Sequence, residues 1–339
     1  MAAAEREHYF NLSVSDQADL LRSLAPLIGR RAEILEKDIW LCQVLGILFG
    51  LSCRKPMAFK GGTSLSKVYR AIDRFSEDID VTVDYRSLVD DAPDLSMINN
   101  SQRTKLSNSL KTALAEHVVK ELAPSLQKAL DEAIPNNRTS ISISEDAEKL
   151  WVYYPSAVEN ADEYLRPSIL IEFGGRNSTL PQTEISITPD IAAYVPDLAF
   201  PVVHVTVLSA ARTFWEKATL IHVECHRPTL RPSAERMSRH WYDLARLADH
   251  EVGAQALNDI DLLRDVLSIK ETFYRSGYSN YSKCISGGMR LIPDGQLLDA
   301  LRQDYQAMVS AQMFYADALE FGSITERLRK LERQINSSF

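Results

Sequence analysis

The chain has 339 residues, of which 45% are hydrophobic and 25% charged, and its formal net charge is −8. This composition is typical of a globular protein large enough for two lobes, and the negative charge excludes a globally basic nucleic-acid binder. Four scattered cysteines indicate reduced thiols, and no apolar run is long enough to span a bilayer. We therefore expect a cytoplasmic protein.

Hydrophobic periodicity predicts an α+β fold. Two amphipathic helices, residues 14–28 and 32–48, precede a short apolar strand at 56–59, a Gly-Gly turn and a helix at 63–70. A polar insertion, residues 86–137, contains a long predicted helix, 102–133, which Pro124 would kink or split. The predicted strands, several of them alternating in polarity, suggest a mixed or largely antiparallel sheet backed by helices. They are residues 56–59, 78–83, 139–144, 150–154, 167–173, 184–187 and 202–205.

The chain after residue 207 reads as almost entirely helical. We therefore expect a first lobe, residues 1–206, with the sheet and the insertion, and a helical C-terminal lobe, residues 207–339. A polar, glycine-containing loop, residues 275–293, interrupts the second lobe and is a candidate substrate contact, although an ordinary surface loop has the same composition. The predicted helices are residues 208–225, 234–250, 254–274, 296–319 and 324–335.

The most informative motif joins a glycine turn to a pair of carboxylates. The turn Gly61-Gly62-Thr63-Ser64 lies between a strand and a helix, where free backbone N–H groups can bind a phosphate. Asp78 and Asp80 lie two apart in the next strand, so both carboxylates point to one face and can reach one divalent cation. A lone Gly-Gly is usually a tight turn and a lone Asp-x-Asp a solvated strand edge, but their order and spacing favour a site for Mg²⁺, with Mn²⁺ as an alternative, and a nucleoside triphosphate.

These residues resemble the nucleotidyltransferase superfamily and, within it, the AbiEii/AbiGii toxin family, which includes the MenT toxins. The superfamily has Gly-Ser where this chain has Gly62-Thr63, a mild departure because the toxin family often shows Gly-Gly-Thr. The resemblance extends to three later positions. It implies that Glu172, at the end of an apolar strand, is a third metal ligand or a base, that Lys217 contacts nucleotide phosphates, and that Asp243 in the Arg-His-x-x-Asp-Leu element is catalytic.

From the residues alone, each of these three positions has a second interpretation. Glu172 could be an edge-strand surface acid, Lys217 a solvated helix lysine, and Asp243 a salt-bridge partner of Arg239 or Arg246.

The resemblance implies a bacterial toxin of a toxin-antitoxin or phage-defence system. It would transfer a nucleoside monophosphate to an acceptor, which by resemblance to the MenT toxins is the 3′ end of tRNA. This would block aminoacylation and translation, and a cognate antitoxin would restrain the toxin. Two alternatives stay open: nucleotidylation of a protein, including its own Ser64 or Ser76, and nucleotide binding without transfer.

A local cluster of arginines and aromatic residues favours an RNA acceptor. Trp215, Trp241 and Tyr242 would be available for base stacking beside the basic side chains. Pairing of the arginines with nearby acids is the plainer interpretation. The basic residues are Arg212, Lys217, Arg227, Arg231, Arg236, Arg239 and Arg246.

Overall fold

The computed structural model describes residues 6–134, 139–158, 166–230 and 236–339. The first five residues, the end of the predicted insertion, the start of the predicted helix 234–250 and Arg231 lie outside this range. The chain forms two compact units. The sheet unit comprises Met1–Thr63, Ser76–Asp90 and Ser109–Val207, and the helical unit comprises Ser64–Phe75, Asp91–Asn108 and Leu208–Phe339.

This division differs from the expected lobes in two early stretches that join the helical unit. The reason is visible in the core, where Leu65, Ala71 and Ile72 are buried among apolar side chains of the C-terminal helices. The last boundary falls after Val207, one residue from the expected position.

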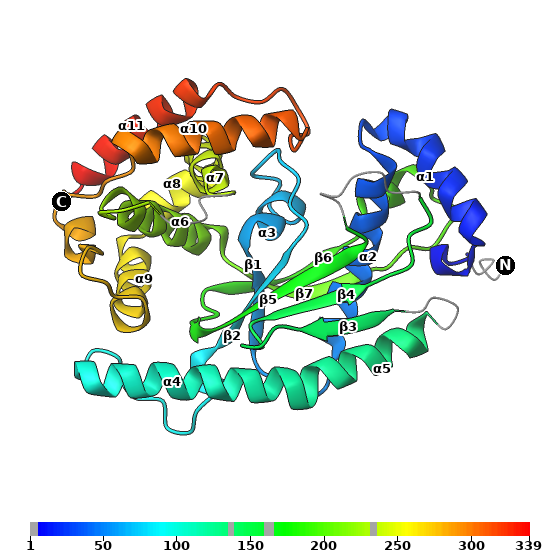
Figure 1. Ribbon diagram of the computed structural model, residues 1–339, viewed down its shortest axis with the longest axis horizontal. Coiled ribbons are helices and arrows are strands. Elements are labelled where there is room, and N and C mark those ends of the chain that lie inside the picture. Colours follow the sequence, from blue (N-terminus) through cyan, green and yellow to red (C-terminus); the bar gives the residue numbers. More distant parts are fainter. Residues whose placement is uncertain (1–5, 135–138, 159–165, 231–235) are drawn as a thin grey trace. The chain divides into compact units, whose positions relative to one another are not determined.

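The sheet unit is built on a seven-stranded mixed sheet of order β3-β4-β5-β2-β1-β7-β6 (Figure 1). β1 is antiparallel to β2 and parallel to β7, β2 is parallel to β5, and β4 is antiparallel to both β3 and β5. All seven predicted strands are present, with ends shifted by a few residues. Their bounds are β1 Met57–Lys60, β2 Ile79–Asp84, β3 Ser140–Ile143, β4 Lys149–Tyr153, β5 Ser168–Asn177, β6 Gln182–Ile187 and β7 Val203–Leu208.

Helices α1 (Val14–Ile28) and α2 (Ala32–Gly50) match the two predicted N-terminal helices. Ser13 caps α1 by accepting from the backbone N–H of Asp16, and Gly29 ends it in the left-handed region at φ 71°. Helix α2 is buried along most of its length and packs on the sheet. A Cβ added at its Gly46 would lie 3.2 Å from Val203 of β7, so a small residue allows this close approach.

The insertion forms consecutive helical segments, as expected. Helix α4 (Asn100–His117) passes through a π turn, Val118–Leu122, into α5 (Ala123–Ala133), without a break in the ribbon (Figure 1). Pro124 lies in the first turn of α5, directly after the π turn, where the i→i−4 pattern of the α-helix is interrupted and a missing backbone N–H is tolerated. The wider π turn therefore accommodates the proline that the sequence predicted to disturb the helix.

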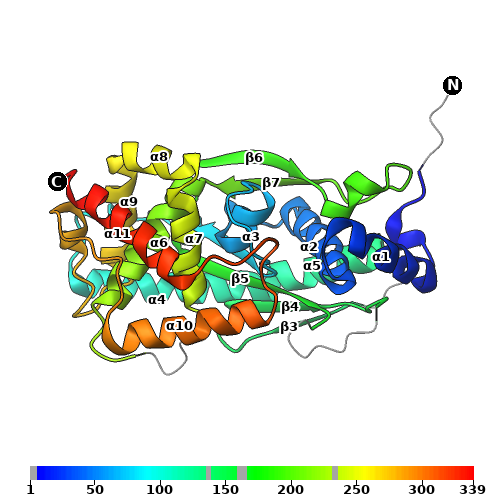
Figure 2. The ribbon, with the colours of Figure 1, turned by 90° about the horizontal axis from the view of Figure 1, so that it is seen from above.

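The helical unit is centred on α6 (Ala210–Cys225) and α7 (Ser238–Ala248). Helix α6 packs against α7, α8 and α9, and α7 also packs against α10 and α11 (Figure 2). The predicted helix 254–274 is two helices, because the Asp259 side chain accepts from the N–H of Leu262 and starts a new one. The predicted helix 296–319 ends at Ser310. The remaining bounds are α3 Gly61–Lys67, α8 Glu251–Asn258, α9 Ile260–Phe273, α10 Gly295–Ser310 and α11 Phe321–Asn336, with 3₁₀ turns at Tyr9–Asn11, Tyr85–Ser87, Asp190–Tyr194 and Tyr281–Ile285.

Across the parts of the chain that the structure covers, no helix combines the length and the apolar character that crossing a membrane requires.

Candidate functional site

The glycine turn and the aspartate pair meet at Gly61 and Asp80. Strand β1 ends at Lys60, which is paired with Asp80 across the antiparallel β1–β2 ladder. Gly61 follows with φ 77°, and a Cβ placed on it would lie 1.9 Å from Oδ2 of Asp80. Both the backbone conformation and the contact therefore require glycine here. The first turn of α3 is pressed against a carboxylate, as a site that binds phosphate and metal together would need.

Thr63 links the same turn to the strand that carries the aspartates. Its Oγ1 donates to the backbone oxygen of Asp78 at 2.6 Å and lies 3.0 Å from Oγ of Ser76. Thr63 and Ser64 are 1% and 0% exposed, and Gly62 is also buried. The Thr63 hydroxyl thus holds the entry to β2 in place. The phosphate-binding role of this turn stays a prediction, and it depends on backbone N–H groups rather than on these hydroxyls.

The two aspartates lie at the start of β2, beside Glu172 in the middle of β5. Ile79 and Val81 are buried at 0% and 1% exposure, as the alternating pattern predicted, while Asp78 and Asp80 keep intermediate exposure. In the parallel ladder Asp80 is the direct partner of Glu172. Residues directly opposite each other point to the same face of a sheet, so the structure places Glu172 on the face that carries Asp80.

Lys149 of β4 is a member of this group that sequence reasoning missed. It is the cross-strand partner of Glu172, and its Nζ lies 2.9 Å from Oε1 of that residue. The hydrogen bond to Glu172 and the charge of Glu172 raise the pKa of Lys149, and the charge of Asp78 adds to the effect. The only available signal was the register of β4 against β5, which hydrophobic alternation alone does not determine.

The donor set suits magnesium bound together with a substrate. Within the ranges described above, no group of three His, Cys, Asp or Glu side chains is arranged to hold a metal on its own. Mg²⁺ is usually held by one or two carboxylates plus substrate phosphates and water, not by an all-protein cage. Asp78 and Asp80 supply carboxylate oxygens as ligands beside the Gly61 turn, so the residues present fit this cation.

In the helical unit, Lys217 and Asp243 belong to one buried ion cluster. Arg74 binds Asp243 with two hydrogen bonds, Nε to Oδ1 at 2.6 Å and Nη2 to Oδ2 at 2.7 Å, and Lys217 Nζ lies 2.9 Å from Oδ2. The side chains of Arg74, Lys217 and Asp243 are 4%, 8% and 0% exposed. The partners of Asp243 are therefore not Arg239 or Arg246, the two helix neighbours weighed from the sequence.

Burial and charge set the protonation states in this cluster. Burial alone would raise the pKa of Asp243, but the charges of Arg74 and Lys217 and their hydrogen bonds hold it well below its usual range. Burial lowers the pKa of Lys217, although Asp243 opposes the shift. Burial and the neighbouring cations lower the pKa of His240, whose Nδ1 lies 3.5 Å from Lys217 Nζ. Two cations on one carboxylate leave an excess of positive charge, which favours an anion near Lys217.

The prediction that Trp215, Trp241 and Tyr242 are available for base stacking is wrong, because the structure buries all three aromatic rings. Trp215 and Trp241 are fully buried, and their indole N–H groups donate to backbone oxygens of Ala256 and Leu291. Tyr242 is only 3% exposed.

Several of the arginines in the expected patch are paired with acids, as the plainer interpretation held. Arg212 is buried beside Asp265, Arg227 pairs with Glu224, and Arg246 pairs with Asp73.

The chain is similar to known proteins both in sequence and in fold. A family model described as "Nucleotidyl transferase AbiEii toxin, Type IV TA system" matches residues 47–329. The solved structure of MenT4, a nucleotidyltransferase toxin from Mycobacterium tuberculosis H37Rv, is similar in fold, with a TM-score of 0.51 and 17% sequence identity. The similarity covers 97% of this chain and 90% of MenT4. No curated protein sequence matches.

Proposed function

This chain belongs to the AbiEii nucleotidyltransferase toxins of type IV toxin-antitoxin systems, and from that premise we propose that it transfers a nucleoside monophosphate to the 3′ end of tRNA. The family also implies an antitoxin partner. The observation that carries the proposal is the contact between the Gly61 turn and the Asp80 carboxylate. It would bring a phosphate-binding element next to a metal-binding one, and nucleotidyl transfer needs both.

In the proposed reaction, a hydroxyl oxygen of the acceptor forms a bond to the α-phosphorus of a nucleoside triphosphate. The bond from that phosphorus to the bridging oxygen breaks, pyrophosphate leaves, and the hydroxyl proton passes to a base or to solvent. Asp78 and Asp80 would hold Mg²⁺, with Mn²⁺ as an alternative, and the bound cation would offset charge on the phosphates. Backbone N–H groups of the Gly61-Gly62-Thr63-Ser64 turn would bind phosphate oxygens.

The two predicted bases differ in accessibility. Asp243 is fully buried and held ionised by two cations, so it is a weak base and is out of reach of a substrate hydroxyl. We assign it a positioning role, in which it orients Lys217 toward a nucleotide phosphate. The Glu172 side chain is 33% exposed and lies on the face that carries Asp80, so it is the better candidate for a metal ligand or base. Lys149 would pair with Glu172 until substrate binds.

The tRNA acceptor, and with it the block of translation, is proposed from the family resemblance of the motifs. A tRNA with an altered 3′ end cannot be aminoacylated, which explains why the toxin needs restraint by an antitoxin. The same effect would stop phage production in an infected cell, and translation places the proposed activity in the cytoplasm.

The test is incubation of the purified protein with each labelled nucleoside triphosphate, Mg²⁺ and total tRNA, followed by separation of RNA from protein. Label on tRNA that disappears with Asp80→Asn and with EDTA would support the proposal and identify the nucleotide. Asp90→Asn is the control, because this aspartate is exposed and lies outside the site. Label on RNA that is unaffected by Asp80→Asn would overturn the assignment of the site.

Self-nucleotidylation, the alternative with a protein acceptor, is detected in the same experiment as label on protein. Of its two candidate serines, Ser64 is 0% exposed and is disfavoured as an acceptor, whereas Ser76 keeps intermediate exposure. Nucleotide binding with no label on either fraction would indicate a nucleotide-binding regulator.

A further inference from the structure

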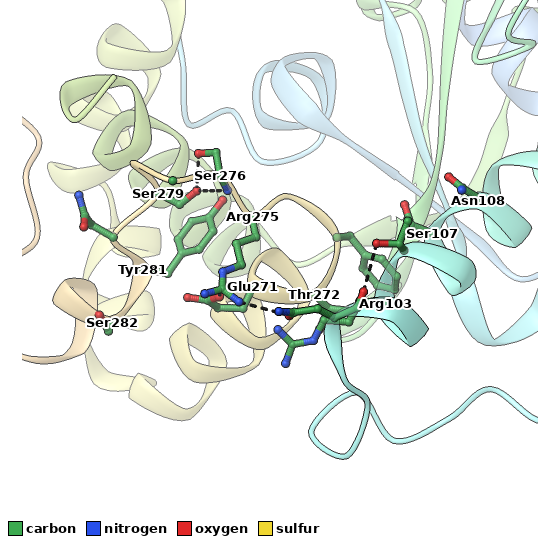
Figure 3. Close-up of a pocket in the computed structure, with 15 residues that line it drawn as sticks. Arg103, Ser107, Asn108, Glu271, Thr272, Arg275, Ser276, Ser279, Tyr281 and Ser282 are labelled. Carbon is green, nitrogen blue, oxygen red and sulfur yellow. Dashed lines mark hydrogen bonds and ion pairs between the residues drawn. The ribbon is translucent and has the colours of Figure 1, made fainter. Parts of the chain in front are cut away.

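A polar cavity of about 640 Å³ lies within the helical unit. The first half of α4 forms one wall, and the end of α9 with the loop that follows it forms the other (Figure 3). The cavity therefore joins part of the insertion to the loop after residue 274, which the sequence indicated as a candidate substrate contact.

The walls of this cavity carry almost no negative charge, although the whole chain carries −8. Residues 95–115 and 272–293 contain no aspartate or glutamate, and Glu271 is the one acid among the lining residues. Hydroxyl and amide side chains provide most of the lining. They include Asn100, Thr104, Ser107, Asn108, Ser276 and Asn280. Such groups bind sugar hydroxyls and phosphate oxygens, which both accept hydrogen bonds.

Two arginines line the cavity with donor capacity to spare. The Arg275 side chain is 59% exposed, and among the residues that the structure describes its contacts are long, with Glu271 at 3.9 Å and with Asn100 Oδ1 at 3.4 Å. The Nε of Arg103 is buried, and within the described chain it has no hydrogen-bond partner. A buried donor without a partner costs free energy, and an anionic ligand would recover it.

We infer that this cavity binds the ribose-phosphate backbone of a single-stranded RNA segment, and this inference rests on the proposed transfer to RNA. Its volume is in the range of pockets that take small ligands, which suits one or two nucleotides rather than a duplex. Tyr274 at the edge of the lining loop is 45% exposed and offers a ring for base stacking. The two large apolar rings of the lining, Phe273 and Tyr281, are buried at 8% and 4% exposure, so an apolar face of a protein partner would find little to pack against.

The test measures binding of a short, unstructured, fluorescently labelled RNA to the full-length chain by anisotropy, with EDTA and without nucleotide. The double variant Arg103→Gln/Arg275→Gln should bind this RNA about tenfold more weakly than the wild type. The slope of its log affinity against log salt concentration should also be smaller, by the amount that about two phosphate contacts contribute. Arg264→Gln is the matched control, since its side chain is 58% exposed and pairs with Asp261 on the same helix. Its binding should equal that of the wild type.

A substitution that increases RNA affinity distinguishes a direct role of this cavity from a folding defect. Glu271→Gln removes the only lining acid, so RNA should bind about two- to threefold more tightly, which a partly unfolded protein would not do. Unchanged binding in both pocket variants, or equal loss in Arg264→Gln, would overturn the inference. So would competition by a mononucleotide or inorganic phosphate at the same concentration of phosphate groups as the RNA. Because Asp80→Asn should leave this binding intact while abolishing transfer, failure of the cavity and failure of the proposed function are distinguishable.

Discussion

At the scale of single residues, Gly61 links the backbone of the turn to the chemistry of the site. Gly61→Ala places a methyl group where Oδ2 of Asp80 lies, at a backbone conformation that L residues adopt with strain. We expect nucleotidyl transfer to fall more than tenfold and the free energy of unfolding to fall by about 1–3 kcal/mol. Labelled-nucleotide transfer and urea denaturation measure the two effects.

Gly29→Ala is the matched control for that substitution. Gly29 has a similar φ of 71°, but a Cβ there would have no atom within 4 Å. It should lose about 1 kcal/mol of stability with transfer unchanged. Equal transfer activity in Gly61→Ala and Gly29→Ala would show that the approach to Asp80 has no part in the site.

The buried charge of Asp243 should contribute to the free energy of unfolding, and this contribution should depend on pH. Asp243→Asn leaves Arg74 and Lys217 buried without a counter-charge, so it should lower the free energy of unfolding by about 3–5 kcal/mol at neutral pH. The pKa of Asp243 is lowered in the folded state, so its contribution is full above its unfolded pKa of about 3.9 and is lost as the pH falls below that value. The difference between wild type and variant should therefore shrink in acid.

Asp73→Asn provides the comparison, because Asp73 pairs with Arg246 while their side chains are 44% and 31% exposed. A pair this exposed should contribute about 0–1 kcal/mol. Urea unfolding of both variants at neutral and acidic pH measures the contrast. A cost for Asp243→Asn that is no larger than that for Asp73→Asn, or one that grows in acid, would contradict the assignment of a buried, ionised Asp243.

The sequence could not predict which charged side chains of the site pair with one another. Arg74 lies in the same sequence motif as Asp80, but its partner Asp243 is 169 residues away. Long-range pairing depends on the packing of several helices, and i,i+3 and i,i+4 rules consider only neighbours on one helix. By contrast, the positions of Asp78 and Asp80 on one face of a strand could be predicted from the apolar pattern, because strand alternation is a local property.

At the scale of elements, the Thr63 hydroxyl connects α3 to the strand that carries the aspartates. Thr63→Val keeps the shape but removes both contacts, to the Asp78 backbone oxygen and to Ser76. We expect a loss of about 1–2 kcal/mol in stability and a several-fold loss of transfer. Thr219→Val is the control, since Thr219 is 0% exposed and donates only within its own helix, to Trp215. It should leave transfer unchanged, and a similar activity loss in both variants would attribute the effect to general destabilisation.

Element type was predictable wherever periodicity was strong, and the errors lie where local polar contacts compete with it. All seven strands and α1 were predicted, because apolar residues recur there at a regular period. The predicted helix 254–274 failed because Asp259 caps a new helix within an apolar pattern that continues across it. The prediction of exposed aromatic rings was wrong because α6 is buried on nearly all sides, so Trp215 has no solvent-exposed face.

At the scale of the whole molecule, the net charge of −8 requires that any contact with RNA be local. The two acid-free segments that line the cavity in the helical unit provide such a place. The sheet unit, by contrast, gathers Asp78, Asp80 and Glu172 near Lys149, which suits a cation with a triphosphate rather than an RNA backbone alone. The carboxylates that are proposed to bind the cation therefore lie in the sheet unit, and the cavity that is proposed to bind RNA lies in the helical unit.

Binding of nucleotide and metal should stabilise the whole chain by mass action. A non-hydrolysable triphosphate analogue with Mg²⁺, at about 100 times its Kd, contributes about 2.7 kcal/mol and should raise Tm by several degrees. EDTA or Asp80→Asn should abolish the shift, because the carboxylate and the cation act together, whereas Asp90→Asn should retain it. Differential scanning fluorimetry measures all four conditions. A full shift in Asp80→Asn would mean that the triphosphate binds elsewhere, whereas a shift that survives EDTA but not Asp80→Asn would mean that the turn binds nucleotide without metal.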